Sequence, residues 1–135
     1  MIEATAIQDQ IYKLGNRAAI PKDLLLLRTV SVGDGTPHLE LKNGEFHYVI
    51  AERGLEFSRR KTTDLDNFLY WFFEAICSRF SFEYELHHRI VGQDPRRIAF
   101  AKRIELMNLI NPTWAAKAQD DISSILVSSP YNDDV

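Results

Sequence analysis

The sequence predicts an α+β fold, in which a small antiparallel sheet is covered by helices, and three observations support this prediction. Residues 38–57 alternate apolar and polar side chains around an Asn-Gly dipeptide, which is typical of a β-hairpin. Residues 65–84 then carry apolar side chains at helical spacing. Finally, an Asp-Pro pair and an Asn-Pro pair each begin a further helical segment. We expect an antiparallel meander of three or four strands, packed against a long central helix and a C-terminal αα-hairpin.

The N-terminal part of the chain is less regular than the rest. Ile7, Ile11 and Leu14 recur at helical spacing and predict an N-terminal helix, which Gly15 can end. After this helix, residues 22–32 fit two structures equally well. Pro21 can begin a short helix, whereas the apolar side chains that follow can also form a strand.

The turn at residues 43–44 sets the expected register of the first two strands. A two-residue loop there places Lys42 opposite Glu45 and Glu40 opposite His47 on one face. A second turn at residues 53–54 places Ile50 opposite Phe57 on the other face. The predicted apolar face consists of Leu39, Leu41, Phe46, Tyr48, Ile50, Leu55 and Phe57. The predicted polar face consists of His38, Glu40, Lys42, Glu45, His47, Glu56, Ser58 and Arg60.

The central helix has an unusually broad apolar surface. Thr63 is its expected N-cap, and Asp66 three residues later completes a capping box. Its apolar stripes are formed by Leu65, Leu69, Phe72, Phe73, Ile76, Cys77, Phe80 and Tyr84. So broad a surface indicates a helix that is contacted on several sides, and we expect Trp71 and Trp114 to be core residues. In the two C-terminal helices, the inward faces are predicted to be Phe100, Ile104, Met107, Ile110, Trp114, Ala118, Ile122 and Ile125.

Length and charge limit the classes of protein to which the chain can belong. Its 135 residues predict one domain over residues 1–135, with an acidic tail at 130–135. The net charge is −3 and neither half is basic, which argues against a general nucleic-acid binder. The basic run at residues 59–61 is interpreted as a solvated strand end. No signal-peptide pattern and no apolar run of membrane-spanning length is evident, so we expect a cytoplasmic protein without a membrane partner.

Residues 81–100 concentrate two histidines, three carboxylates and three arginines. His87 and His88 are neighbours, so on a helix they point about 100° apart and cannot share one metal ion. Glu83 with His87 supplies only half a zinc site, and a set on the predicted sheet (His38, Glu40 and His47) is the other candidate. Hydrogen-bonded or solvated histidines are the favoured interpretation, so we expect no metal and no cofactor. Cys77 lies on an apolar stripe, so it predicts an inert thiol, and no catalytic motif is found.

Arg96 and Arg97 occupy the first turn of a predicted helix, where the helix dipole disfavours cations by about 0.3–1 kcal/mol. Acidic residues that can compensate lie on both sides: Glu83, Glu85, Asp94, Asp133 and Asp134. Glu85 is also spaced to pair with Arg89 at i+4. We therefore expect a structural helix junction formed by Glu85, Arg89, Asp94, Arg96 and Arg97.

Six short motifs occur in an order that resembles a known family. They are ERG (52–54), TTDLD (62–66), LYWFF (69–73), YEL with HR (84–86 and 88–89), QDPRR (93–97) and NPTWA (111–115). Together they resemble immunity protein 63, a family of bacterial polymorphic-toxin immunity proteins, over residues 44–130. Residues 1–35 match it poorly. The resemblance implies a cytoplasmic antidote that binds the toxin domain of an effector and carries out no chemistry. It transfers no binding residues.

The predicted polar face is the candidate toxin-binding surface, because its opposite face has enough apolar residues to form the core. The candidate residues are His38, Glu40, Lys42, Glu45, His47 and Glu56. A merely solvated sheet face is an equally good interpretation of the same pattern. At the level of function, a small regulatory or scaffold module is the alternative to an immunity protein, and a metal-dependent enzyme is a more distant one.

Overall fold

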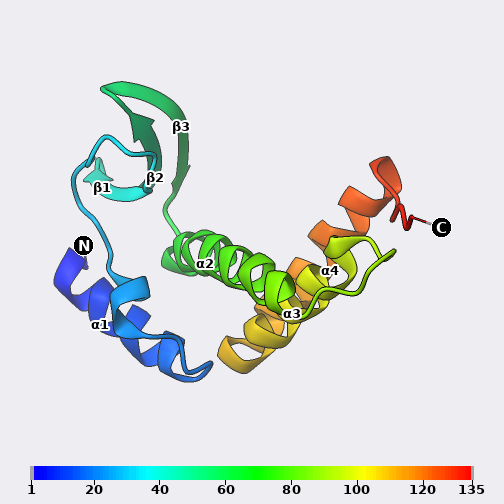
Figure 1. Cartoon of the computed structure of the whole chain (residues 1–135). Coiled ribbons are helices and arrows are strands. Elements are labelled where there is room, and N and C mark those ends of the chain that lie inside the picture. The colour runs from blue at the N-terminus through cyan, green and yellow to red at the C-terminus, as the bar shows by residue number, and fades with distance from the viewer. Residues whose placement is uncertain (1, 135) are drawn as a thin grey trace. The chain divides into compact units, whose positions relative to one another are not determined.

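The computed structural model describes residues 2–134, which divide into two compact units. The N-terminal unit ends at Phe72, and the C-terminal unit begins at Phe73. The N-terminal unit contains α1 (Ala4–Asn16), the 3-10 helix η1 (Lys22–Leu25), β1 (His38–Lys42), β2 (Glu45–Glu52) and β3 (Leu55–Thr62). The C-terminal unit contains α3 (Pro95–Ile110) and α4 (Pro112–Ser128), and α2 (Leu65–His87) runs from one unit into the other (Figure 1). The predicted α+β class is confirmed.

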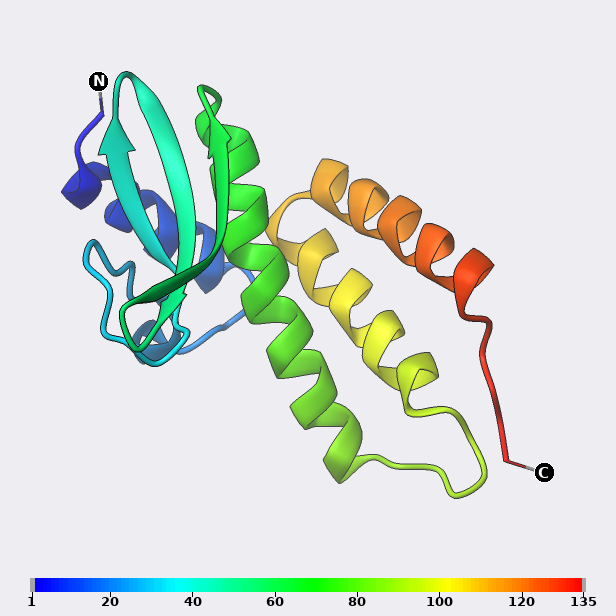
Figure 2. The ribbon, with the colours of Figure 1, turned by 90° about the horizontal axis from the view of Figure 1, so that it is seen from above.

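The three strands form an antiparallel meander in the order β1-β2-β3 (Figure 2). The first turn has positive φ at both Asn43 (52°) and Gly44 (75°), as a type I′ hairpin turn requires. The predicted register of β1 and β2 is confirmed, since Lys42 pairs with Glu45 and Glu40 pairs with His47. A two-residue loop of this kind fixes which side chains share a face.

The predicted register of β2 and β3 is wrong beyond the turn. Glu52 pairs with Leu55 as expected, but Ile50 pairs with Ser58 instead of Phe57. The register shifts at a β-bulge between Ile50 and Ala51, so Phe57 is the additional residue, and it is 62% exposed. Leu55 is also exposed and is not a core residue.

This bulge moves the following β3 residues to the opposite faces from those predicted. Ser58 and Arg60 lie on the apolar face, opposite Ile50 and Tyr48. Arg59 and Lys61 lie instead on the polar face, because Arg59 pairs with Val49 and Lys61 pairs with His47. The predicted placement of Ser58 and Arg60 on the polar face is therefore wrong.

Aromatic side chains join the apolar sheet face to the first turns of α2. The Phe68 ring lies 6.2 Å from Phe46 and 5.9 Å from Tyr48, between ring centroids. Trp71 contacts Tyr48 edge-on but is only half-buried, and the Arg60 guanidinium lies 4.3 Å above its ring. Trp71 is thus at the border of the core, contrary to prediction.

The N-cap of α2 is Asp64 and not the predicted Thr63. The Asp64 carboxylate accepts a hydrogen bond from the Asp66 backbone N–H at 2.9 Å. The Thr62 hydroxyl in turn accepts one from the Asp64 N–H at 3.0 Å. The helix start is therefore stabilised by the residue next to the one expected.

Gly15 lies within α1 and does not end it, contrary to prediction. A Cβ atom at this position would come within 2.4 Å of the Leu25 side chain. A side chain at this position would require Leu25 to move, so glycine favours the close packing of α1 against η1. The Gln8 side chain also ties these segments together, since it donates to the Leu25 carbonyl (2.8 Å) and accepts from the Leu27 N–H (2.7 Å).

The ambiguous residues 22–32 form η1 and then an extended segment. Arg28 makes an isolated parallel bridge to His38, and its carbonyl accepts from the Leu39 N–H at 2.8 Å. Further along, Asp34 makes an isolated antiparallel bridge to Glu52. Within residues 2–134 these bridges add no fourth strand to the sheet. Residues 29–31 thus run close to the outer edge of β1.

Helices α3 and α4 lie side by side as the predicted αα-hairpin (Figure 2). Asp94 caps α3 and Asn111 caps α4, each through its side-chain oxygen, as predicted. Trp114 is 2% exposed and contacts Phe73, so this predicted core residue is confirmed.

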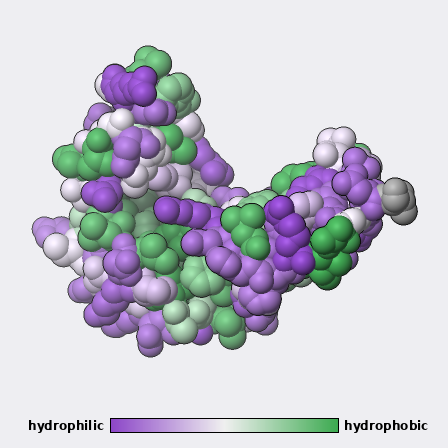
Figure 3. Space-filling model, viewed as in Figure 1, coloured by the Kyte–Doolittle hydropathy of each residue, from purple (hydrophilic) through white to green (hydrophobic). Residues whose placement is uncertain are grey.

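Two further features of the C-terminal unit differ from the expected pattern. Ile125 is 41% exposed, whereas Arg103 is buried beside Glu74, with 3.6 Å between their charged atoms. Exposed apolar side chains in this unit include Leu86, Ile90, Val91, Leu109 and Val127. Apolar and polar atoms are accordingly interspersed on the surface in Figure 3. Among residues 2–134, no helix has both the length and the apolarity that a membrane span needs.

Candidate functional site

The structure brings the predicted polar residues together on one face of the sheet. We use the term polar face for the following residues: His38, Glu40, Lys42, Glu45, His47, Glu56, Arg59 and Lys61. Strand alternation directs them to the same side, and the hairpin turns hold them in register. The first six are those predicted from the sequence, and the bulge adds the last two.

Glu40 lies at the centre of this face and accepts hydrogen bonds from three side chains. Lys42 Nζ lies 2.9 Å from Glu40 Oε1, and His38 Nε2 lies 2.8 Å from Oε2. Arg59 donates to both carboxylate oxygens, at 3.2 and 3.3 Å. These donors, Lys42 first, lower the pKa of Glu40 to about 2, so the carboxylate is ionised at neutral pH.

Arg59 is the residue that the sequence interpretation missed. Its guanidinium also donates to Glu56, with the shortest contact at 2.7 Å, and to His47 Nδ1 at 2.8 Å. The carboxylates of Glu56 and Glu40 raise the pKa of Arg59 above its usual value, and Arg59 lowers the pKa of Glu56. The interpretation of residues 59–61 as a solvated strand end is therefore wrong for Arg59. Locating the bulge would have placed this residue correctly.

The two histidines of the polar face are buried, whereas their charged neighbours on the same face, Glu40 and Glu45, are partly exposed. His38 and His47 are each 5% exposed. Arginine can only donate, so His47 Nδ1 accepts from Arg59, and its other ring nitrogen faces Glu45 at 3.5 Å. Both rings are thus held by specific partners on the same face.

Opposite charges balance each other on the polar face. The carboxylates are Glu40, Glu45 and Glu56, and the permanent cations are Lys42, Arg59 and Lys61. Because carboxylates and cations are equal in number, the face is not an acidic patch. Recognition there would depend on the positions of individual groups more than on net attraction.

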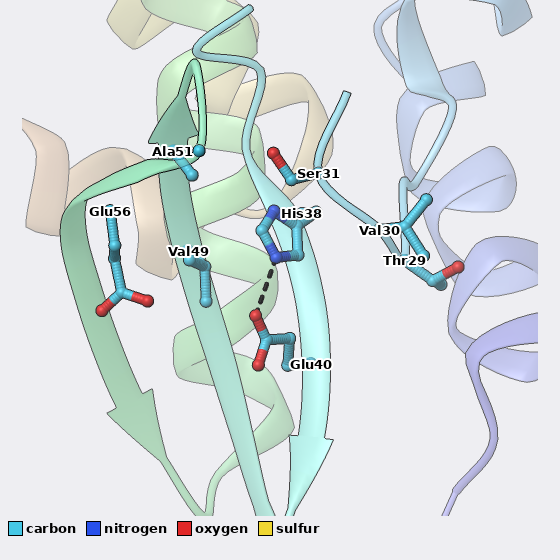
Figure 4. A pocket seen from close by; sticks show the side chains of 9 residues that line it. Thr29, Val30, Ser31, His38, Glu40, Val49, Ala51 and Glu56 are labelled. Carbon is cyan, nitrogen blue, oxygen red and sulfur yellow. Dashed lines mark hydrogen bonds and ion pairs between the residues drawn. The ribbon is translucent and has the colours of Figure 1, made fainter. Parts of the chain in front are cut away.

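A pocket of about 420 Å³ opens on this face, beside residues 29–31 (Figure 4). His38 and Glu40 line it from β1, Val49 and Ala51 from β2, and Glu56 from β3. Exposed apolar side chains occur at Val30, which lines the pocket and is 68% exposed, and at Leu55 and Phe57, the sequence neighbours of Glu56, which are each 62% exposed. Exposed aromatic and aliphatic groups next to an ordered polar surface are typical of protein interfaces.

The proposed metal ligands do not converge. Among residues 2–134, no group of three or more histidine, cysteine or acidic side chains is placed to hold an ion. His88 stacks on Tyr84, with 3.9 Å between ring centroids, and its Nδ1 lies 2.9 Å from the Tyr84 carbonyl. Cys77 is fully buried, and burial raises the pKa of its thiol to about 12. A thiol of this kind is not a nucleophile at neutral pH.

The residues of the predicted helix junction lie in two groups within the C-terminal unit. Glu85 is buried and forms a bidentate pair with Arg89, with contacts of 2.7 and 3.0 Å. The Asp94 carboxylate pairs with Arg96 and accepts from the Asn132 N–H. These contacts lower the pKa of Asp94 well below its usual range, and Arg96 contributes most to the shift.

The C-terminal segment lies against the start of α3. Arg96 donates to the carbonyls of Ser129 (2.9 Å) and Pro130 (2.8 Å). Arg97 pairs with Asp133 at 3.0 Å and lies 4.3 Å above the Tyr131 ring. Two arginines that the helix dipole disfavours thus have acidic and aromatic partners within the chain.

Comparison with known proteins identifies the family. A family model described as immunity protein 63 matches residues 42–124, from the end of β1 into α4. No curated protein and no solved structure matches the chain. The match covers more than half of the sequence and includes all six motifs that suggested the resemblance. The chain therefore belongs to the immunity protein 63 family.

Proposed function

We propose that this chain binds a cognate toxin domain in a stoichiometric complex and neutralises it without catalysis. Membership of the immunity protein 63 family is the observation that carries the proposal. A protein of this class acts inside the cell that produces the toxin, so we place it in the bacterial cytoplasm. Its protective activity then depends on its affinity for the toxin and on which part of the toxin surface it covers.

The proposed binding surface is the polar face with the adjoining turn at residues 53–54. Its side chains are held in place before binding, because Glu40, Arg59 and Glu56 restrain one another. A surface that is already ordered loses less conformational entropy when a partner binds. Exposed Leu55 and Phe57, the sequence neighbours of Glu56, offer apolar contact area that this network of charges lacks.

The test begins with the toxin domain encoded next to the gene for this chain. Toxin activity is measured at a fixed toxin concentration, well above Kd, while the chain is added in increasing amounts. We expect activity to fall linearly and to reach zero at one equivalent, and the two proteins to elute together. Complete inactivation by a small fraction of an equivalent would indicate an enzyme, and absence of a complex would also contradict the proposal.

A further inference from the structure

The environment of His38 defines which of its ring nitrogens carries the proton. His38 Nε2 lies 2.8 Å from a Glu40 carboxylate that is ionised at neutral pH and so can only accept. Nε2 therefore carries hydrogen, and in the neutral ring Nδ1 has a lone pair. Among residues 2–134, no group donates a hydrogen bond to this buried Nδ1 atom.

Burying a hydrogen-bond acceptor without a donor costs free energy, so an unpartnered buried acceptor needs an explanation. Figure 4 shows the His38 ring among the side chains that line the pocket on the polar face, with the dashed contact to Glu40 on one side of the ring. The pocket volume of about 420 Å³ is many times the roughly 30 Å³ that one water molecule occupies in the liquid. It has room for a long amino-acid side chain.

The ionisable groups that line this pocket are acceptors. They are His38, Glu40 and Glu56, and none of the described lining residues is a lysine or an arginine. The nearby Arg59 directs its donors to Glu40, Glu56 and His47. Glu56 is about half-exposed, so its carboxylate can be reached from solvent. The pocket thus favours a ligand that donates hydrogen bonds and carries positive charge.

We propose that this pocket receives a lysine or arginine side chain of the toxin, which pairs with the accessible carboxylate of Glu56 and donates a hydrogen bond to the buried His38 Nδ1 once the atoms that cover it move aside. The inference rests on the proposed function and specifies the chemistry of its partner. The lining residues before position 42 lie outside the matched family segment. The pocket therefore joins strands of the family segment to a part of the chain that the family model does not cover.

The first test needs no toxin and uses butylguanidinium as the probe, with butylurea as its neutral counterpart of similar shape. Imidazole ¹⁵N resonances of the full chain report the tautomer of His38. We expect a lone pair on Nδ1 in the free chain and a saturable shift of this resonance with butylguanidinium, several-fold stronger than with butylurea. Glu56→Gln should weaken the response, whereas Glu45→Gln, on the same face outside the pocket, should not.

Three results would overturn the inference. They are a proton on Nδ1 in the free chain, equal responses to the two probes, and no response to either, which would mean that the pocket holds only water.

The second test measures Kd for the toxin with His38→Gln, with Glu56→Gln and with a control variant. Loss of a charge-assisted contact at the pocket should raise Kd about ten-fold or more for His38→Gln and several-fold for Glu56→Gln. Glu105→Gln, an exposed position on α3 outside the proposed binding surface, should change it less than two-fold. Tight toxin binding that neither His38→Gln nor Glu56→Gln alters would overturn the inference and leave the proposed function intact. Absence of toxin binding by the unaltered chain would instead contradict the proposed function, and the probes would still decide the chemistry of the pocket.

Discussion

The guanidinium of Arg59 contacts one side chain from each strand of the sheet: Glu40 in β1, His47 in β2 and Glu56 in β3. On the described polar face, no other side chain forms hydrogen bonds with side chains of all three strands. The Arg59 guanidinium lies between the carboxylates of Glu40 and Glu56 and orients the buried imidazole of His47. Networks of this kind are stable when every member has a partner, and removing the central member leaves several groups unsatisfied.

We therefore predict that Arg59→Met lowers the melting temperature by several degrees more than Lys61→Met. Both positions lie on the polar face of β3, but Lys61 is exposed, whereas Arg59 holds Glu40 and Glu56 together. Thermal unfolding followed by circular dichroism measures the difference. Equal melting temperatures for the two variants would mean that the network contributes no stability.

A second prediction concerns acid. The pKa of Glu40 is about 2 in the folded chain and 4.5 in the reference state, so its pairing stabilises the fold fully above pH 4.5. This stability is lost as the pH falls through about 2. Denaturant titrations between pH 5 and pH 2 should show a smaller decrease in unfolding free energy for Glu40→Gln than for the unaltered chain. The same decrease in both proteins would show that the Glu40 contacts do not persist in solution.

At the scale of secondary-structure elements, much of the sheet could be predicted and one decisive feature could not. Asn43 and Gly44 specify the first turn locally, so the register of β1 and β2 follows from the sequence. The segment 55–62 fits two registers, because its alternation is weak and three basic residues follow each other. The choice depends on distant contacts, namely Arg59 with Glu40 and Arg60 with Trp71. Such long-range contacts cannot be derived from local pattern.

The same limit applies to the site. The first six residues of the polar face follow from strand alternation, whereas burial of His38 and His47 does not, because charged neighbours suggest exposure. Similarly, the caps Asp94 and Asn111 are local signals and were predicted, but packing of Gly15 against Leu25 is a tertiary contact.

The bulge at Phe57 gives the most specific prediction at this scale. Phe57 is mostly exposed, so Phe57→Ala should change the unfolding free energy by no more than about 0.5 kcal/mol. Deletion of Phe57 removes the additional residue but keeps Ser58 opposite Ile50 and Arg59 opposite Val49, so the deletion variant should also stay folded with Arg59 on the polar face. Urea denaturation of the two variants tests this. A deletion variant far less stable than Phe57→Ala would contradict this prediction and show that the strand needs the bulge.

The start of α3 gives a further prediction. Arg96 holds the carbonyls of Ser129 and Pro130, whereas Arg97 forms one half-exposed ion pair with Asp133. Arg96→Ala should lower the melting temperature more than Arg97→Ala, and both variants should keep toxin affinity within about two-fold. Thermal unfolding and calorimetric binding measure these quantities. A loss of affinity at unchanged melting temperature would make this cluster a binding site instead.

At the scale of the whole molecule, the two units have different proposed roles. The N-terminal unit contains the polar face, its pocket and the exposed side chains of Leu55 and Phe57. In the C-terminal unit, the charged groups at the helix junction are paired within the chain. The family match includes elements of both units, so family membership alone does not locate the toxin. The pocket on the polar face is the reason we propose the N-terminal unit as the toxin-binding part.

Mapping the toxin on the chain tests this account most directly. Backbone amide resonances of the chain are compared before and after addition of one equivalent of the toxin domain. We predict that the largest changes fall within residues 29–61, including His38, Glu56 and the turn at 53–54, and that α3 and α4 change little. Changes confined to residues 95–128, with the polar face unaffected, would contradict it.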